Sequence, residues 1–245
     1  EVDSLFVLPN MSDAGLSLGA ICARGGLERQ KLKDVFWGES YSEKDVLSSL
    51  ERANLKGERF DEPDEKIGQL LSEGKIVGRF TGRMEWGPRA LGNRSILVRT
   101  TDRAVVDRLN DLLRRSDFMP FAPAVLDEDA DEYVVNAEPA RHTAEFMSVC
   151  FDCTPKMKQE HPAVVHLDGT ARAQLVRSES NPAFHRILTS FKKHCGQSVV
   201  LNTSFNIHEE PIIRTPDEAV AAFLKAGLDY LAIENYIVRL PASRA

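Results

Sequence analysis

The chain has 245 residues, of which 42% are hydrophobic, and it carries a formal net charge of -6. This length and composition support one large domain, or a medium domain plus a fragment, and exclude a disordered polypeptide. The sequence has no run of eighteen apolar residues, and its start has no basic region followed by an apolar core. We therefore expect no transmembrane helix, no membrane contact and no signal peptide.

The first part of the chain predicts a strand and two helices. The apolar run 5–9 is typical of a strand, and residues 10–23 indicate a turn followed by a helix of small residues. Ser42 and Asp45 have the spacing of a capping box, which predicts the start of a second helix. Because the chain lacks an initiating methionine and begins almost directly in an apolar run, we expect it to be part of a longer protein.

The polar segment 54–64 predicts a domain boundary, which divides the chain into residues 1–60 and 61–245. Beyond this segment, helical and strand-like periodicities alternate. They predict helices over 65–72, 102–113, 181–195 and 215–226, and strands over 75–80, 145–151, 163–167, 198–205 and 230–240. This alternation predicts an α/β fold.

The four cysteines are Cys22, Cys150, Cys153 and Cys195, of which only the middle two are close in sequence. No second pair stands at a zinc-finger distance, so we expect these two thiols to pack in a strand rather than to bind zinc. Sparse cysteine favours a reducing, cytoplasmic setting.

Nine arginines and no lysine lie between Arg79 and Arg115. The arginine fork matches phosphate or carboxylate in two hydrogen bonds, whereas lysine is a point charge. Such an arginine-rich segment in an acidic chain favours a site for a small anion over a nucleic-acid surface, which needs a basic domain. Within GRMEWGPRALGNRSIL we expect anion binding by Arg83, Arg89 and Arg94, and the alternative is structural ion pairs. Arg99, Arg103 and Arg108 fit that alternative better.

Other patterns carry polar groups in positions that suit a ligand. Arg114 and Arg115 end a predicted helix, where the helix dipole alone could explain them. Arg172 follows the tight turn of HLDGTARAQLV, in which His166 is expected to be structural. The buried strand in LNTSFN ends in four polar side chains, and α/β proteins bind ligands at such strand ends. No P-loop and no G-x-G-x-x-G motif is present, so a nucleotide site would be of another type.

Taken together, GRMEWGPRALGNRSIL, RRSDFMPFAPAVL, HLDGTARAQLV and LNTSFNIHEEPII resemble the C-terminal half of the O-carbamoyltransferases. This family includes enzymes that modify nodulation factors and aminoglycoside or cephamycin antibiotics, and the motifs are most similar to the nodulation branch. The resemblance implies a YrdC-like twisted mixed sheet with helices over residues 61–245. It also implies that residues 1–60 are the tail of an actin-like domain, whose larger part would precede this chain.

The resemblance also implies the reaction and its participants. The YrdC-like domain would combine ATP, with Mg²⁺, and carbamoyl phosphate into carbamoyl adenylate. The actin-like domain, which holds iron or another divalent metal in the full-length protein, would transfer the carbamoyl group to a hydroxyl of a saccharide or natural product. Because the metal-binding histidines of the family lie outside this chain, we expect metal to bind it poorly.

Specific residues match the motifs of the family. Arg89 matches the GPRALG arginine, Arg115 ends the basic motif that usually carries a lysine and an arginine, and Arg172 matches the DGTAR arginine. Ser204 and Asn206 match the S-x-N pair that binds nucleotide phosphates.

Arg83 and Arg114 complete the expected anion-binding set. Asp13, which by itself would be read as a helix cap, matches the aspartate that the actin-like domain supplies to its metal. Two positions depart from the family pattern: Leu113 or Arg114 stands at the usual lysine, and Glu209 stands at a usual glycine.

The leading hypothesis is therefore an enzyme, the adenylating half of an ATP-dependent O-carbamoyltransferase. One alternative is a non-catalytic module of YrdC-like fold that binds nucleotides or RNA, although the acidic balance of the chain argues against nucleic acid. A third reading is an interaction or folding unit that is inert without its partner domain.

Overall fold

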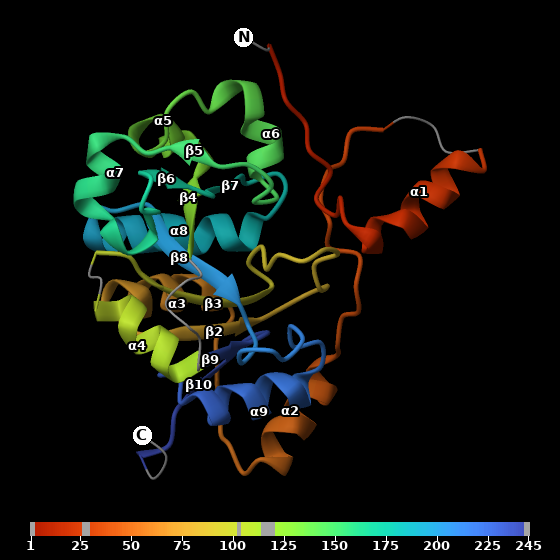
Figure 1. Ribbon diagram of the computed structural model, residues 1–245. Coiled ribbons are helices and arrows are strands. Elements are labelled where there is room, and N and C mark those ends of the chain that lie inside the picture. Colours follow the sequence, from red (N-terminus) through yellow and green to blue (C-terminus); the bar gives the residue numbers. More distant parts are fainter. Residues whose placement is uncertain (1–2, 26–29, 102–103, 114–120, 243–245) are drawn as a thin grey trace.

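The computed structural model describes residues 3–25, 30–101, 104–113 and 121–242 (Figure 1). Its centre is an eight-stranded sheet in the order β1-β10-β9-β2-β3-β8-β4-β7. The pairs β2–β9 and β4–β7 are parallel, and the other neighbours are antiparallel. The strands of this sheet are β1 (Glu58–Arg59), β2 (Val77–Phe80), β3 (Arg94–Arg99), β4 (Ala122–Leu126), β7 (Gln174–Val176), β8 (Val199–Ser204), β9 (Tyr230–Ile233) and β10 (Tyr236–Arg239). A separate two-stranded sheet pairs β5 (Phe151–Asp152) with β6 (Thr170–Ala171).

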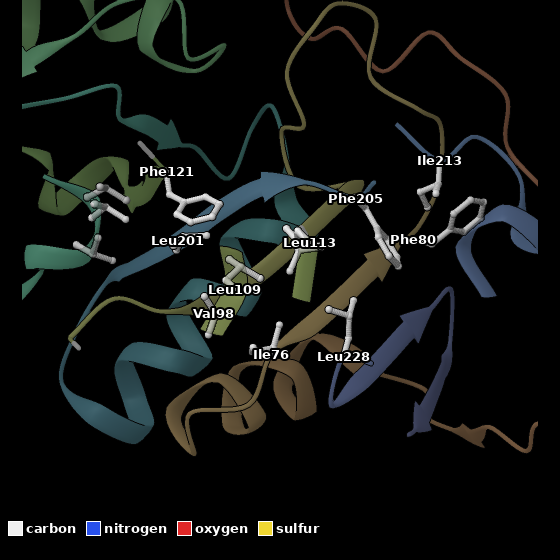
Figure 2. Packing of buried hydrophobic residues seen from close by; sticks show 14 of the residues in the cluster. Ile76, Phe80, Val98, Leu109, Leu113, Phe121, Leu201, Phe205, Ile213 and Leu228 are labelled. Carbon is white, nitrogen blue, oxygen red and sulfur yellow. The ribbon is translucent and has the colours of Figure 1, made fainter. Parts of the chain in front are cut away.

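Helices cover both faces of the sheet. α3 (Pro63–Ser72) and α8 (Pro182–Cys195) pack on one face through a cluster that includes Leu70, Phe184 and Phe191. A larger cluster on the other face joins α4 (Ala104–Leu113) and α9 (Pro216–Ala226) to β2, β3 and β8. Figure 2 shows its side chains, among them Phe80, Leu113 and Phe205. The remaining helices are α1 (Leu16–Ala23), α2 (Glu43–Arg52), α5 (Ala130–Tyr133), α6 (Arg141–Ala144) and α7 (Pro155–Glu160).

Strand register brings together the end of β8 and the starts of β3, β4 and β7. The side of the sheet on which these strand ends lie is called the sheet edge below. Ser95 near the start of β3 pairs with Ser204 at the end of β8, and Ala122 at the start of β4 pairs with Asn202. Gln174, the first residue of β7, pairs with Ala124 of β4. The segments that precede β3, β4 and β7 therefore reach the sheet where β8 ends.

Several predicted elements are wrong. Residues 5–9 are not a strand, because the N–H groups of Leu5 and Val7 bond to the Pro139 carbonyl and the Thr143 hydroxyl rather than to a neighbouring strand. Most of 145–151 is turn and loop, and Met147 breaks the extended run with φ 53°. Residues 163–167 fall in a 3-10 helix (Pro162–Val164) and the turn after it. The predicted strand over 230–240 is the hairpin β9–β10.

The predicted boundary near residue 60 stays a prediction, and so does the actin-like origin of residues 1–60. Val46 and Leu50 of α2 belong to the larger core cluster, and β1 pairs with β10, so residues 43–59 pack as part of the main sheet structure. α1, in contrast, has no buried residue and stands away from the sheet (Figure 1). Among the described helices, none is long and apolar enough to cross a membrane.

Candidate functional site

A single buried carboxylate organises the loop between β2 and β3, which contains the GPRALG motif. Glu85 is 5% exposed, and its Oε1 atom accepts hydrogen bonds from the backbone N–H groups of Leu91, Asn93 and Arg94 at 2.8, 2.7 and 3.1 Å. A carboxylate oxygen that accepts three N–H groups replaces the regular partners that an irregular backbone lacks. The loop thereby has a fixed shape without being helix or strand.

The carbonyl groups that follow Arg89 are also held by side chains. Asn202 Nδ2 donates to the Ala90 carbonyl at 3.2 Å, and Gln174 Nε2 donates to the Leu91 carbonyl at 2.9 Å. Gln174 and Asn202 contact each other too, because Nδ2 of Asn202 donates to Oε1 of Gln174 at 2.8 Å. These buried amides satisfy loop carbonyls that would otherwise be costly to bury.

The Gln174–Asn202 pair brings together three motifs that are far apart in sequence. Gln174 lies two residues after Arg172, Asn202 lies two residues before Ser204, and both bond to the two residues that follow Arg89. The structure therefore assembles the GPRALG, DGTAR and LNTSFN segments at the sheet edge where β8 ends. The sequence predicts that these motifs form one site, but it does not predict the Gln174–Asn202 pair that joins them.

Glu85 was missed as well, although the sequence contains a signal for it. It is the one acidic residue between Arg79 and Arg99. A lone carboxylate among arginines, in a loop rich in glycine, suits an internal hydrogen-bond acceptor better than a solvated side chain.

Arg94 is a structural support of this loop. It is fully buried, its guanidinium lies 3.7 Å from the centre of the Phe80 ring, and its Nη atoms donate to the carbonyls of Thr81 at 2.7 Å and Gly82 at 3.1 Å. Burial lowers its pKa, and the nearby carboxylate of Glu85 opposes that shift. Anion binding by Arg94 is therefore a wrong expectation, because the side chain is fully buried and both of its Nη atoms already donate to protein carbonyls.

Arg79 supports the same loop from β2. Its Nη1 atom donates to the Gly92 carbonyl and to Asn93 Oδ1, and its Nη2 atom lies 3.7 Å from Asp64 Oδ1. Arg79 also lines a cavity of about 350 Å³ between α3, α8 and the β9–β10 turn. Among the predicted ligand residues that the structure describes, none lines this cavity.

Arg83 is exposed and contacts another part of the chain. Its Nε and Nη2 atoms donate to the carbonyls of Gly38 at 3.0 Å and Trp37 at 2.7 Å. This contact fixes the segment before α2 against the loop. A role of Arg83 in anion binding stays a prediction.

Arg89 differs from these arginines. It is half-buried, and within the described residues no hydrogen bond or ion pair occupies its guanidinium. Gly87 and Gly92 on either side both have φ 119°, which glycine alone adopts readily. A Cβ at Gly92 would lie 2.6 Å from Cδ1 of Phe184, so this position also needs the space. The loop thus holds the backbone around Arg89 and leaves its charged head available.

Arg172 is half-buried just after β6 and lies close to His166. Burial, with a smaller contribution from the charge of Arg172, lowers the pKa of His166. The imidazole Nδ1 lies 3.0 Å from the Thr170 hydroxyl in the same turn. This contact agrees with the expected structural role of His166.

Ser204 and Asn206 form a hydrogen-bonded turn at the end of β8. The Ser204 hydroxyl donates to Asn206 Oδ1 at 2.6 Å, and Asn206 Nδ2 donates to the Glu210 carbonyl at 2.7 Å. Between them, the N–H of Phe205 donates to the Arg94 carbonyl at 2.9 Å. The turn is therefore attached directly to the residue at which the Glu85 loop ends.

Leu113 can be removed from the candidate site. It is 1% exposed in the core, so its side chain cannot stand for the lysine of the family motif. Its carbonyl accepts a hydrogen bond from the N–H of His208 at 3.0 Å, two residues after Asn206. The residues predicted to follow in the site, Arg114 and Arg115, lie outside the described part of the chain.

Glu209 is the second departure from the family pattern, and its backbone has a conformation that favours glycine. It has φ 67°, in the left-handed region that glycine adopts at little cost. The loop after Asn206 therefore keeps the conformation that a glycine would favour.

Asp13 lies exposed in a 3-10 turn (Asp13–Gly15) before α1. Within the described ranges, no group of three or more His, Cys, Asp or Glu residues could hold a metal ion. Since one carboxylate is too few ligands, the assignment of Asp13 to a metal depends on residues from elsewhere and stays a prediction.

The family model described as "Carbamoyltransferase C-terminus" matches residues 68–240, which is more than half of the chain. The chain belongs to the carbamoyltransferase family. This membership confirms the resemblance on which the motif assignments rest.

Among similar curated proteins is the nodulation protein NolO of Bradyrhizobium diazoefficiens, 35% identical over 98% of this chain and 46% of its own length. Nodulation protein NolNO of Sinorhizobium fredii is 35% identical over 96% of this chain and 36% of its own length. The 3'-hydroxymethylcephem-O-carbamoyltransferase of Streptomyces clavuligerus is 33% identical over 89% of this chain and 40% of its own length. The chain thus spans less than half the length of these relatives.

Solved structures with a similar fold include full-length HypF in a phosphate- and nucleotide-bound form. HypF is 20% identical, with a TM-score of 0.52 over 76% of this chain and 23% of its own length. The HypF of T. kodakarensis is 19% identical, with a TM-score of 0.50 over 71% of this chain and 21% of its own. The expected α/β fold, a YrdC-like twisted mixed sheet with helices, is confirmed.

Proposed function

We propose that this chain is the adenylating half of an ATP-dependent O-carbamoyltransferase, which forms carbamoyl adenylate from ATP and carbamoyl phosphate. The observation that supports this most directly is the Gln174–Asn202 amide pair. Through it, the segments that carry Arg89, Arg172 and Ser204 meet at one sheet edge. Membership of the carbamoyltransferase family supports a carbamoyl-transfer reaction, and the meeting of these segments supports a ligand site at the sheet edge.

The electrostatic demand of this reaction fits the residues at that edge. ATP and carbamoyl phosphate are both polyanions, so a site that holds them together must offset their mutual repulsion. Arg89 and Arg172 are two cations carried by segments that meet there, and Arg114 and Arg115 would add two more. Guanidinium groups aimed at phosphate oxygens also stabilise the charge that develops during displacement.

The reaction would proceed in three steps. Water displaces phosphate from carbamoyl phosphate and leaves carbamate. A carbamate oxygen then attacks the α-phosphorus of ATP, the bond between the α-phosphorus and its bridging oxygen breaks, and pyrophosphate leaves with Mg²⁺. The acceptor hydroxyl finally attacks the carbamoyl carbon, loses its proton and releases AMP. Because carbamoyl adenylate is labile in water, closed passage to the acceptor would protect it.

Ser204 and Asn206 would bind the nucleotide phosphates in this scheme. The Ser204 hydroxyl donates to Asn206 Oδ1, and Asn206 Nδ2 donates one hydrogen to the Glu210 carbonyl, so both side chains are already oriented. Asn206 keeps a second amide hydrogen for a phosphate oxygen, and the Ser204 hydroxyl would turn its hydrogen from Asn206 to the phosphate. A preoriented pair loses little side-chain entropy when a phosphate oxygen arrives.

The transfer step would need the part of the longer protein that this chain does not contain. Asp13 would supply one carboxylate to the metal of the actin-like domain, and the exposed Leu16 and Ile21 of α1 would pack against that domain. The greater length of the curated relatives supports this division. The acceptor, a saccharide or natural-product hydroxyl, would bind mostly there.

The test uses the full-length protein with ATP, carbamoyl phosphate and Mg²⁺, and measures pyrophosphate release. We expect release from the native protein and a loss on the order of 100-fold or more in Arg89→Ala and Arg172→Ala, since one charge-stabilising donor is worth about that much. Arg108→Ala is the matched control, because Arg108 pairs with Asp229 at 2.8 Å outside the site. No pyrophosphate from the native protein would refute the proposal.

A further inference from the structure

The conformation of the loop between β2 and β3 depends mainly on one side chain, that of Glu85. Glu85 Oε1 accepts three N–H groups within four residues, at Leu91, Asn93 and Arg94. Neither a helix nor a strand orders the stretch between β2 and the start of β3. The conformation of this stretch is therefore set by side-chain acceptors and donors, and Glu85 is the acceptor with the most bonds.

The same carboxylate is linked to both halves of the proposed site. On one side, its bond to the Leu91 N–H fixes the chain two residues after Arg89. On the other side, its bond to the Arg94 N–H fixes the residue whose carbonyl receives the N–H of Phe205, between Ser204 and Asn206. A movement of Glu85 would therefore alter the arginine and the S-x-N turn together.

The electrostatic surroundings keep Glu85 in place. Its carboxylate opposes the burial-induced lowering of the pKa of both Arg79 and Arg94. Both arginines donate to carbonyls of the same loop, at Gly92 and at Thr81 and Gly82. Glu85 Oε2 is buried and has no hydrogen bond within the described residues, so the hydrogen bonds converge on Oε1 alone.

We propose that Glu85 is a positioning residue for the adenylation site: it sets the distance between Arg89 and the Ser204–Asn206 turn without contacting substrate. This inference rests on the proposed function. A misplacement of about 1 Å at a reacting centre can cost on the order of 100-fold in rate, so the loss of three N–H bonds at this loop should be visible in turnover.

The experiment is a double-mutant cycle in the full-length protein, read as pyrophosphate release. We expect Glu85→Ala to lower kcat on the order of 100-fold. Glu85→Gln, whose amide oxygen can accept the same three N–H groups, should recover most of that loss. Glu85→Ala combined with Arg89→Ala should lose less than the product of the two single losses, because Glu85 acts in part through Arg89. Glu58→Gln, an exposed carboxylate on β1, is the matched control.

Amide hydrogen exchange separates positioning from loss of fold. Glu85→Ala should speed exchange at Leu91, Asn93 and Arg94 while exchange in the interior of β8 stays slow. If Glu85→Ala does not fold, the cycle is run with Glu85→Gln, whose smaller loss must likewise combine with that of Arg89→Ala to less than the product.

Full activity of Glu85→Ala, or losses that multiply in the double variant, would overturn the positioning role while leaving the proposed function intact. Absence of pyrophosphate release from the native protein would instead remove the proposed function, and the positioning role with it.

Discussion

His161 is a fully buried histidine whose Nδ1 lies 2.7 Å from the Thr100 hydroxyl. Burial, together with the charges of Lys156 and Arg99, lowers its pKa to about 4. The unfolded chain binds a proton at this residue near pH 6.5, whereas the folded protein does so only near pH 4. Stability is therefore undiminished above pH 6.5 and falls as the pH decreases from 6.5 to 4, by on the order of 3 kcal/mol in all.

The prediction is checked by the free energy of unfolding in urea at pH 7, 5.5 and 4. His161→Gln cannot titrate, so we expect its deficit relative to the native protein to shrink steadily over this range. His194→Gln, at an exposed position on α8, should show no such trend. A constant deficit for His161→Gln would mean that another group causes the acid loss.

Glu209 is a residue whose backbone conformation is unfavourable for any side chain with a Cβ. A side chain with φ 67° is strained by about 1 kcal/mol, and glycine removes that strain at the cost of a more flexible unfolded chain. We expect Glu209→Gly to raise the free energy of unfolding by about 0.5 kcal/mol. Glu209→Ala, which removes the same charge but keeps a Cβ, should give no gain, and thermal unfolding of the three proteins decides the matter.

The packing of α3 on α8 depends on a glycine whose replacement would ordinarily favour a helix. Alanine at Gly68 would gain about 1 kcal/mol in helix propensity. A Cβ there, however, would lie 2.6 Å from Ser190 Cβ and 2.7 Å from the backbone nitrogen of Phe191, so α8 must shift. We expect Gly68→Ala to lower the free energy of unfolding by about 1–2 kcal/mol.

Urea unfolding measures this change, and α1 provides the comparison. A Cβ at Gly19 would meet no atom within 4 Å, so Gly19→Ala should be neutral or stabilising. If both variants behaved alike, the close approach of α3 and α8 would not matter for stability.

Elements with local start and stop signals were the ones that the sequence predicted. Ser42 with Asp45, and Thr215 with Glu218, form the capping boxes of α2 and α9, and Gly196 ends α8 in a left-handed conformation. These interactions span four residues or fewer, so their chemistry is visible in the sequence.

Elements whose partners lie far away in sequence were not predicted. The apolar run 5–9 has the composition of a strand, but Val7 bonds to Thr143, which composition cannot reveal. The sequence predicts one strand where the structure has the hairpin β9–β10, because the two-residue turn of Glu234 and Asn235 interrupts the apolar pattern only briefly. Glu234 there has φ 47° and accepts the N–H of Gly82 at 2.8 Å.

In the candidate site, too, the sequence predicted the local motifs but not the contacts between distant residues. The sequence shows the motifs of the site, but it does not show that Arg89 and Arg94 have different roles. Both stand in one glycine-rich segment, and only the fold shows that Arg94 is buried against Phe80 and two carbonyls. The supporting residues Glu85 and Gln174 act through buried hydrogen bonds to distant backbone, which no local pattern encodes.

Ligand binding at the sheet edge should raise the free energy of unfolding of the whole molecule. Ser204 ends β8 near the centre of the eight-stranded sheet, and the loop that carries Arg89 leads into the neighbouring strand β3, so global unfolding must release a bound nucleotide. ATP at 100 times its Kd would then stabilise the protein by about 2.7 kcal/mol. A module that binds RNA would instead be stabilised by single-stranded RNA, strongly at low salt and weakly at high salt.

Thermal unfolding of this chain with ATP and Mg²⁺, with single-stranded RNA, and without ligand distinguishes the two functions. The net charge of -6 opposes a long polyanion but not a compact one held by a few arginines, so we expect ATP to raise the Tm and RNA to leave it unchanged. Arg172→Ala should abolish the shift caused by ATP, whereas Arg108→Ala should preserve it. Stabilisation by RNA that disappears at high salt, with none by ATP, would favour the binding module over the adenylating enzyme.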